Sequence, residues 1–444
     1  MPAAPDQPLP AGSLSLEKVQ RLIGGFAVYM FALSAVLSTA GIYIFPGLMV
    51  LALLLNPRPF LRFCRDTPLV WVAAGLTTYI AIRTVAATYE YPDNTDQIIK
   101  SGKELLMIAG IPAVVLAWFL AQDMRRAYGA VLLYILALVV FFFMEAGWDT
   151  LQTYLAGETQ ERLFFGGHSN LIGTFYATGL LGILTVGFGL LERLRHRFPT
   201  WALVLAAAVL TAVATLFLLI VFWNQGRTVW IALAISLVGL VLFVLPRLGT
   251  VRSHPGTAGL LSFGLLLVVA GAVYANWSLI EKRTQQLTPE LQEIIRGEVP
   301  RKGFSGSLRS RYWMNVAGAK ATEKRPFWGW GPGNYDLVVK YAGPKHLNKW
   351  DQIHNLYIQL ATGLGIAGLA GFAFLIAGGL RGLAQGFTKN GIPLPVAAFA
   401  GAAMTYFLIL SLAQIRHDDP PGQAYLVLLL GLLLTGAALR NRGS

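Results

Sequence analysis

A histidine followed by asparagine and tyrosine is the group in this sequence best suited to acid–base chemistry. His354 precedes Asn355, Leu356 and Tyr357, where a long polar segment gives way to an apolar one. A neutral imidazole takes a proton from a hydroxyl group near neutral pH, which lysine or arginine does only after a large pKa shift. His354 is therefore the candidate general base, although its position alone also fits a histidine that hydrogen-bonds at a helix start.

Two arginines are the candidates for binding an anion. Arg227 lies in a very short turn between two apolar segments, where a fixed charge is costly unless it is partnered or near water. Guanidinium groups bind phosphate oxygens in a bidentate fork, so Arg227 and Arg309 are predicted to hold a diphosphate. Anchoring to lipid headgroups is the alternative. Other residues are predicted to line one cavity together with Arg227 and Arg309. They are Arg162, His168, Arg311, Trp313, Arg416 and His417.

The sequence offers no pattern for a metal, a cofactor or a nucleic acid. Histidine, cysteine and carboxylate residues do not cluster at ligand spacing, so a metal-independent mechanism is expected. The glycine-rich stretch 329–333 follows no predicted strand and lacks the Lys-Ser or Lys-Thr of a phosphate loop. It is predicted to form a tight turn.

The elements that position these residues are membrane-spanning helices. The 444 residues are 55% hydrophobic and 13% charged, more apolar than a soluble protein of this size. A span needs about 20 mostly apolar residues. About twelve spans are predicted, at residues 20–37, 40–56, 68–87, 104–121, 128–146, 171–191, 201–223, 229–246, 258–277, 356–379, 394–414 and 423–439. The fold class is an all-α polytopic membrane protein.

Basic residues set the expected orientation. Short loops on one side carry Arg and Lys and are predicted to be cytoplasmic, with both chain ends on that side. The loops around Tyr91, Tyr154, Arg227 and Arg416 then face the other side, as does a long loop before His354. The chain therefore divides into nine spans at 1–277, a large extracytoplasmic loop at 278–354 and three spans at 355–444.

The large loop is predicted to contain short helices and to bind an anion. Thr288 is expected to cap one helix that ends at Gly297, and Ser307 a second that runs from Leu308 to Lys320. The second helix places Arg309 and Trp313 on one face and Arg311 on another. Between residues 278 and 354 there are thirteen Lys and Arg against seven Asp and Glu, an excess that favours an anionic ligand.

Three segments together resemble the O-antigen ligase family of the bacterial O-antigen ligase and polymerase superfamily. They are residues 225–230 (Gln-Gly-Arg-Thr-Val-Trp), residues 309–334, and residues 354–359 (His-Asn-Leu-Tyr-Ile-Gln). Arg227, Arg309 and His354 occupy the positions of the two arginines and the histidine of the family pattern. Family members often carry a glutamate nine residues after the histidine, whereas this chain has Gly363, so any role of that acid is in doubt here.

The resemblance implies a glycosyltransferase with a GT-C-like membrane fold in the bacterial inner membrane and an active site on the periplasmic side. It implies that a glycan is transferred from undecaprenyl diphosphate to a sugar hydroxyl of the lipid A core, with inversion and without a cofactor. In this scheme His354 is the base and Arg227 and Arg309 bind the diphosphate. Trp313, Trp328 and Trp330 are expected to stack on sugars or to lie at the membrane interface.

Three alternatives remain open at the level of sequence. An O-antigen polymerase typically has two sizeable arginine-bearing periplasmic loops, whereas one is predicted here. A protein O-oligosaccharyltransferase usually has more soluble mass after the membrane part, whereas this sequence ends at Ser444, close to its last predicted span. A transporter of lipid-linked glycans would use charges within its spans, whereas nearly all charges here lie at span ends. The ligase is favoured.

Overall fold

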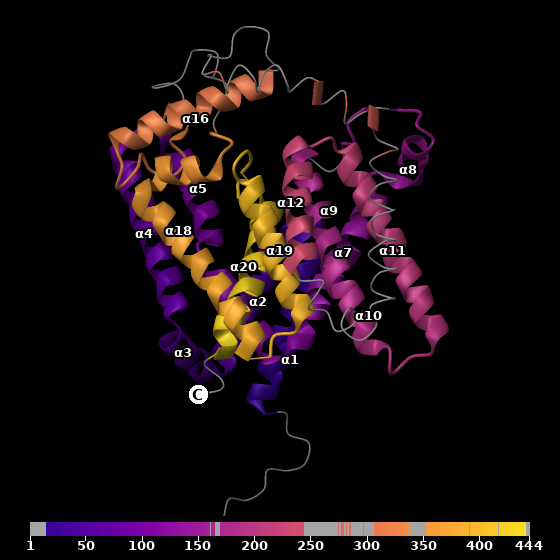
Figure 1. Ribbon diagram of the computed structural model, residues 1–444. Helices are drawn as coiled ribbons and strands as arrows, with labels where there is room; N and C mark the ends of the chain where they lie inside the picture. Colours follow the sequence, from indigo (N-terminus) through magenta and orange to yellow (C-terminus); the bar gives the residue numbers. More distant parts are fainter. Residues whose placement is uncertain are drawn as a thin grey trace, which may run out of the picture.

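The computed structural model describes residues 15–159, 161–164, 169–243, 306–335, 337–338, 352–389, 391–415 and 417–440, and isolated positions between 274 and 296. Every regular element within these ranges is helical, as the all-α prediction requires. Apolar side chains from most of the helices form one large buried cluster. Figure 1 shows the long helices running side by side between two ends of the molecule.

The first part of the chain forms a series of long helices joined by very short turns. They are α1 (Leu16–Leu37), α2 (Thr39–Leu55), α3 (Pro57–Asp66), α4 (Pro68–Glu90), the 3₁₀ turn η1 (Pro92–Asn94), α5 (Thr95–Ile108), α6 (Ile111–Gln122), α7 (Met124–Glu145) and α8 (Gly147–Leu155). Ser38 alone separates α1 from α2, and its hydroxyl caps α2 by accepting from Gly41 N–H at 3.2 Å. The predicted break between the first two spans is therefore confirmed.

The rest of the described chain completes the bundle. Its helices are α9 (Ser169–Gly182), the π-helix η2 (Ile183–Gly187), α10 (Phe188–Leu194), α11 (Thr200–Trp223), α12 (Arg227–Phe243), α16 (Gly306–Lys324), α18 (Leu356–Lys389), α19 (Leu394–Leu410) and α20 (Pro420–Arg440). The helix predicted at Leu308–Lys320 is present as α16. It begins two residues earlier, so Ser307 lies inside its first turn and is not its cap.

The membrane character of the chain is clear, but the number of spans stays a prediction. In the part of the chain that the structure describes, eight helices are long and apolar enough to cross a membrane, and the α2–α3 pair, bent by 102°, would be a ninth. The helices α12 and α19 are apolar but shorter. Every predicted span coincides with described helices except 258–277, of which only residues 274 and 277 are described. Of the helix expected from Thr288 to Gly297, only Arg296 is described.

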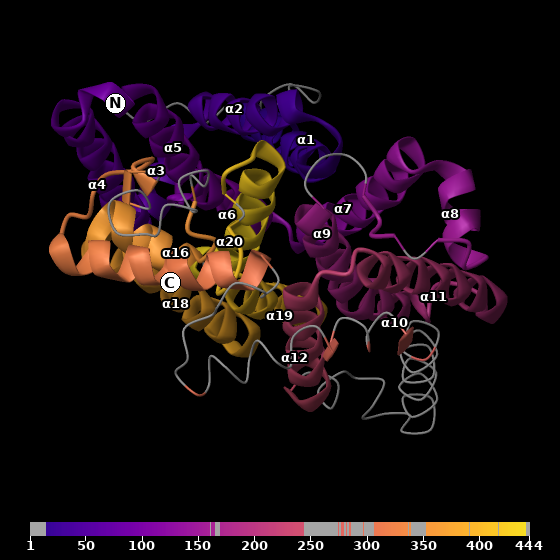
Figure 2. The same ribbon diagram turned by 90° about the horizontal axis from the view of Figure 1, so that it is seen from above.

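The helix α16 marks one end of the molecule. Figures 1 and 2 show it lying across the ends of the long helices and over α18, instead of running parallel to them. The start of α18, the α4–α5 and α11–α12 turns and the α19–α20 loop lie at this same end (Figure 1), called the α16 end below. These are the segments that the sequence predicts on the extracytoplasmic side, and this orientation of the α16 end stays a prediction.

Candidate functional site at the α16 end

The backbone around His354 is held in a fixed turn. His354 has a left-handed conformation with φ 56°, and Gln225 at φ 55° is the only other described non-glycine residue with positive φ. Asn355 caps α18, since its Oδ1 accepts from the N–H groups of Tyr357 at 3.1 Å and Ile358 at 3.2 Å. The Gln359 side chain turns back to accept from Ile353 N–H at 3.1 Å. Histidine tolerates this conformation better than most residues, and such strained positions concentrate at functional sites.

The helix α16 packs directly on the segment that carries the histidine. Ile353 is fully buried in a small cluster with Met314 and Tyr335, and Trp313 packs against it. The two helices lie close together at Gly318, where a Cβ atom would lie 2.5 Å from Ile358 Cγ2. Thr362 Oγ1 donates to Gly318 O at 3.2 Å. The position of α16 relative to His354 is therefore fixed by side-chain packing and hydrogen bonds.

The glycine-rich stretch that follows α16 is a turn seated on a break in α18. Gly329, Gly331 and Gly333 all have positive φ, as the predicted tight turn requires. Trp330 N–H donates to Thr362 O at 2.7 Å and Gly331 N–H to Gly363 O at 2.9 Å. The regular helix is interrupted at Gly365, which has φ 70° and ψ −177°. The loop thus satisfies carbonyls that the break leaves without helical partners.

Tyr335 occupies the space beside Gly363, where family members often carry a glutamate. A Cβ atom on Gly363 would lie 2.7 Å from the Tyr335 hydroxyl oxygen. The hydroxyl is buried and makes no hydrogen bond within the described part of the chain, and burial raises its pKa. A larger side chain at position 363 would displace this ring, so Tyr335 and Gly363 are matched in size.

Arg311 is the arginine of α16 that the described structure brings to Arg227. Burial, and then the positive charge of Arg227, lower the pKa of Arg311. Arg311 makes no ion pair with any described residue. It shares a face of α16 with Met314 and Gly318, three and seven residues further on, so it belongs to the face that packs on α18. Two guanidinium groups from different helices thus lie near each other at the α16 end.

The turn that carries Arg227 is itself anchored by Arg162. Arg162 Nε donates to Asn224 O at 2.6 Å, and the next residue, Leu163, donates its N–H to Trp223 O at 2.9 Å. Arg227 is the first residue of α12, so its side chain adds to the partial positive charge of that helix end. An anion at this point would interact with the Arg227 guanidinium and with the positive end of the α12 helix dipole.

The α19–α20 loop runs alongside the histidine segment. Leu356 N–H donates to Ser411 O at 2.9 Å, and the Gln352 side chain donates to Asp418 Oδ2 at 2.9 Å. His417 is only 2% exposed, and its Nδ1 makes no hydrogen bond to described residues. Burial lowers the pKa of His417, an effect that Asp418 partly opposes. His417 is therefore a neutral histidine. It lies next to Asp418, which accepts the hydrogen bond from Gln352 in the segment that carries His354.

Most of the predicted site residues lie at the α16 end, and three lie partly or wholly outside the described residues. His354, Arg227, Arg311, Arg162, Trp313 and His417 are described there. The Arg309 backbone lies in the first turn of α16 while its side chain is outside the description, and His168 and Arg416 lie outside it entirely. The catalytic and binding roles assigned to these residues stay predictions.

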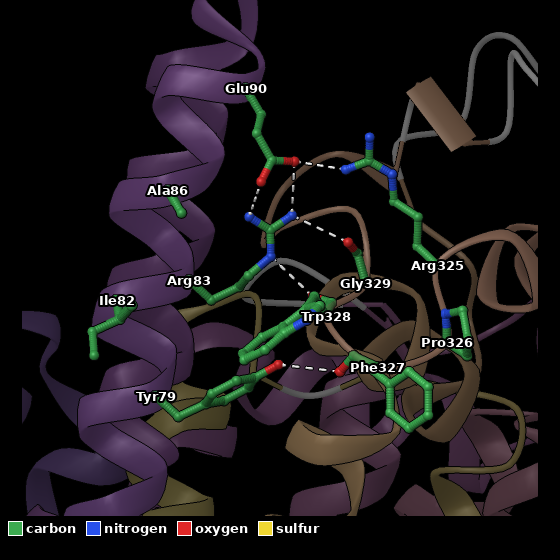
Figure 3. A pocket seen from close by; sticks show the side chains of 10 residues that line it. All are labelled: Tyr79, Ile82, Arg83, Ala86, Glu90, Arg325, Pro326, Phe327, Trp328 and Gly329. Atoms are coloured by element: carbon green, nitrogen blue, oxygen red, sulfur yellow. Dashed lines mark hydrogen bonds and ion pairs between the residues drawn. The ribbon is translucent and has the colours of Figure 1, made fainter.

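An ion-pair cluster that sequence reasoning missed joins the glycine-rich loop to α4 (Figure 3). Arg83 contacts both carboxylate oxygens of Glu90, at 2.9 and 3.2 Å, and donates to Trp328 O at 2.9 Å and Gly329 O at 3.1 Å. Arg325 Nη1 donates to the same carboxylate at 2.6 Å. Arg83 lies inside the predicted span 68–87, and an arginine within a span is a signal that could have found the cluster.

An apolar cavity of about 400 Å³ begins directly below the histidine segment. Its upper wall contains Leu356 and Tyr357, the first two residues of α18, and its lining continues along that helix to Leu380. Residues of α19 and α20 form the other walls. Among the described residues no group of three or more histidine, cysteine or acidic side chains could hold a metal.

Fold and site together define an all-helical, polytopic membrane protein with a histidine and two arginines at one end of its spans. Residues 212–373 match the family model described as O-antigen ligase. This match confirms the predicted resemblance to the O-antigen ligase family over that part of the chain, which includes Arg227, Arg311 and His354. Arg83, Arg162 and His417 lie outside the matched residues. No curated protein matches the chain.

Proposed function

We propose that this protein is an O-antigen ligase, a membrane glycosyltransferase that moves a glycan from undecaprenyl diphosphate to a sugar hydroxyl of the lipid A core. The observation that carries the proposal is the fixed His354 turn above the apolar cavity, at the same end of the molecule as Arg227 and Arg311. The family match supports a ligase or polymerase of this superfamily. The inner membrane, the periplasmic site and the GT-C-like fold are part of the proposal.

In the proposed reaction His354 acts as general base on the acceptor. Its neutral imidazole takes the proton of the acceptor hydroxyl while the oxygen forms a bond to the anomeric carbon. The bond from that carbon to the diphosphate oxygen breaks on the opposite side, so the anomeric configuration inverts. The electron pair of the broken bond leaves with the diphosphate.

Guanidinium groups stabilise the departing diphosphate in this scheme. Arg227 stands at the start of α12, and the described structure brings Arg311 to it, whereas the sequence favours Arg309 as the second arginine. Charges held in place before the reaction stabilise developing negative charge more effectively than mobile water does. We assign Arg227 and Arg311 to the diphosphate on this ground, and Arg309 stays a candidate for the same anion.

The apolar cavity suits the lipid part of the donor. A polyprenyl chain is a long series of apolar, methyl-branched units without hydrogen-bonding groups, and α18 lines the cavity from Leu356, at the histidine end, to Leu380. A donor lying in it would present its diphosphate next to Leu356, two residues from His354. This placement supports a lipid-linked donor over a soluble one.

The test is glycan transfer by the purified protein in liposomes that contain undecaprenyl-diphosphate glycan and lipid A core. We expect ligated core with inverted configuration, also in the presence of a chelator. His354→Asn should lower the rate by about 10²-fold or more, the usual contribution of a general base. Asparagine tolerates the left-handed backbone of this position, so the variant should retain its thermal stability. His196→Asn, at an exposed histidine between α10 and α11, is the matched control.

The outcomes separate the competing functions. Growth of carrier-linked chains with an unmodified core would identify a polymerase. Transfer that survives His354→Asn, or a product with retained configuration, would remove His354 as the base of an inverting reaction. Translocation of the donor across the bilayer without any new glycosidic bond would replace the transferase by a transporter.

A further inference from the structure

A second pocket lies between α4 and the segment 325–329, which leads from α16 into the glycine-rich loop (Figure 3). It has a volume of about 500 Å³ and lies outside the His354 segment. Its lining combines two arginines and one glutamate with a mostly apolar wall: Tyr79, Ile82, Arg83, Ala86, Glu90, Arg325, Pro326, Phe327, Trp328 and Gly329. None of the residues proposed above for catalysis contributes to it.

The charges in this pocket do not balance. Arg83 is 4% exposed, and Glu90 and two carbonyl oxygens take up its hydrogen-bonding groups. Arg325 contacts the same Glu90 through Nη1 and is 42% exposed. Two arginines thus share one carboxylate, which leaves one surplus positive charge. The remaining N–H groups of Arg325 make no hydrogen bond to described residues, although its guanidinium lies 4.8 Å from the Trp330 ring centroid.

The side chains around that charge are large, apolar and exposed. Phe327 is 69% exposed, Trp328 is 64% exposed, and Ile82 lies on the same exposed side of α4. Trp328 stacks on Tyr79 with ring centroids 6.0 Å apart. Tyr79 lies near the middle of α4, whereas Glu90, which pairs with Arg325, is the last residue of that helix. The apolar part of the pocket therefore lies further from the helix end than its charges do, and an uncompensated charge next to apolar groups is unfavourable in a membrane. An anion attached to an apolar chain would satisfy both parts of the pocket.

We propose that this pocket binds an acidic phospholipid of the surrounding leaflet. Its phosphate accepts from the free N–H groups of Arg325, and its acyl chains lie on the apolar side chains of α4 and Phe327. A free phosphate ion would find one guanidinium and otherwise apolar walls, so the attached chains favour the lipid. Arg83 and Glu90 position the loop that carries Arg325. This proposal does not depend on the transferase activity.

The test is lipid binding to the full-length protein in detergent, measured by native mass spectrometry. Phosphatidylglycerol, phosphatidylcholine and inorganic phosphate are titrated separately. We expect a preference for phosphatidylglycerol, which Arg325→Gln weakens about fivefold, the contribution of one arginine near an anionic headgroup. Arg325→Lys keeps the charge and should retain most of the affinity. Arg381→Gln removes an exposed arginine of α18 far from the pocket and is the control.

A second variant protects the test against misfolding of Arg325→Gln. Ala86→Glu keeps both arginines and adds the missing negative charge to the pocket lining, so it should weaken phosphatidylglycerol binding to a similar degree. Equal loss in Arg381→Gln, unchanged affinity in Ala86→Glu, or no preference over phosphatidylcholine would overturn the proposal. Displacement of the lipid by millimolar phosphate would show a simple anion site instead.

Discussion

The substitution Gly318→Ala tests whether the contact between α16 and α18 holds His354, the proposed general base, in place. The new Cβ would lie 2.5 Å from Ile358 Cγ2 and 2.9 Å from Ile353 Cδ1, whereas ordinary contacts begin at 3.4 Å. The helices must therefore separate by up to about 0.9 Å. Overpacking of this kind destabilises by roughly 1–3 kcal/mol. The displacement acts on Ile353, whose neighbour is His354.

The expected effect on activity is larger than the effect on stability. A displacement near 1 Å at a reacting group lowers rates by about 10²-fold, so Gly318→Ala should reduce the initial rate of glycan transfer to that extent. The assay is the liposome reaction described above, with thermal denaturation measured in parallel. Gly401→Ala in α19 is the control, since its Cβ meets no atom within 4 Å.

A rescue experiment makes the prediction specific. Ile358→Ala removes the methyl group that the new Cβ would strike first, so the double variant should recover most of the activity lost by Gly318→Ala. The reasoning is refuted if Gly318→Ala transfers at the normal rate, or if Gly401→Ala is equally damaging. It is also refuted if the double variant is no better than the single one, because the clash would then not be the cause.

Three further substitutions test the turns around this site. Gln359→Met removes the acceptor of the buried Ile353 N–H, so we expect a loss of about 1–3 kcal/mol in the free energy of unfolding together with slower transfer. Burial lowers the pKa of His417, so as the pH falls the unfolded chain binds a proton at this histidine before the folded protein does. The free energy of unfolding should therefore decrease as the pH drops below about 6.5. Thermal scans at about pH 8 and 5.5 should show this decrease, and His417→Gln should abolish it. Gly365→Ala would place a Cβ atom 2.0 Å from Phe327 O on a backbone with φ 70°. The purified variant should therefore melt at a clearly lower temperature. An unchanged melting temperature would contradict the strained geometry.

Hydropathy predicts the helices of this protein well because lipid imposes a simple rule on them. Apolar length marks the spans, and Ser38 marks a break because its hydroxyl caps the next helix. The glycine-rich turn also follows from composition, since three of its residues need positive φ. These features depend on local sequence alone.

The parts that could not be predicted depend on contacts between distant segments. Helical spacing separates Arg309 from Arg311, but only the docking of α16 through Gly318 shows that Arg311 shares the face packed on α18. Arg83 and its partner Trp328 are 245 residues apart in sequence. Periodicity carries no information about such pairs.

The break in α18 has a consequence for how this protein can be recombined with its relatives. The glycine-rich loop fits only a helix that exposes the carbonyls of Thr362 and Gly363, and those carbonyls need the loop. Tyr335 and Gly363 are likewise matched in size. A chimera that inherits residues 306–335 from one parent and 352–366 from another would combine two segments whose hydrogen bonds and side-chain sizes do not match. Exchange of both segments together would preserve the fit.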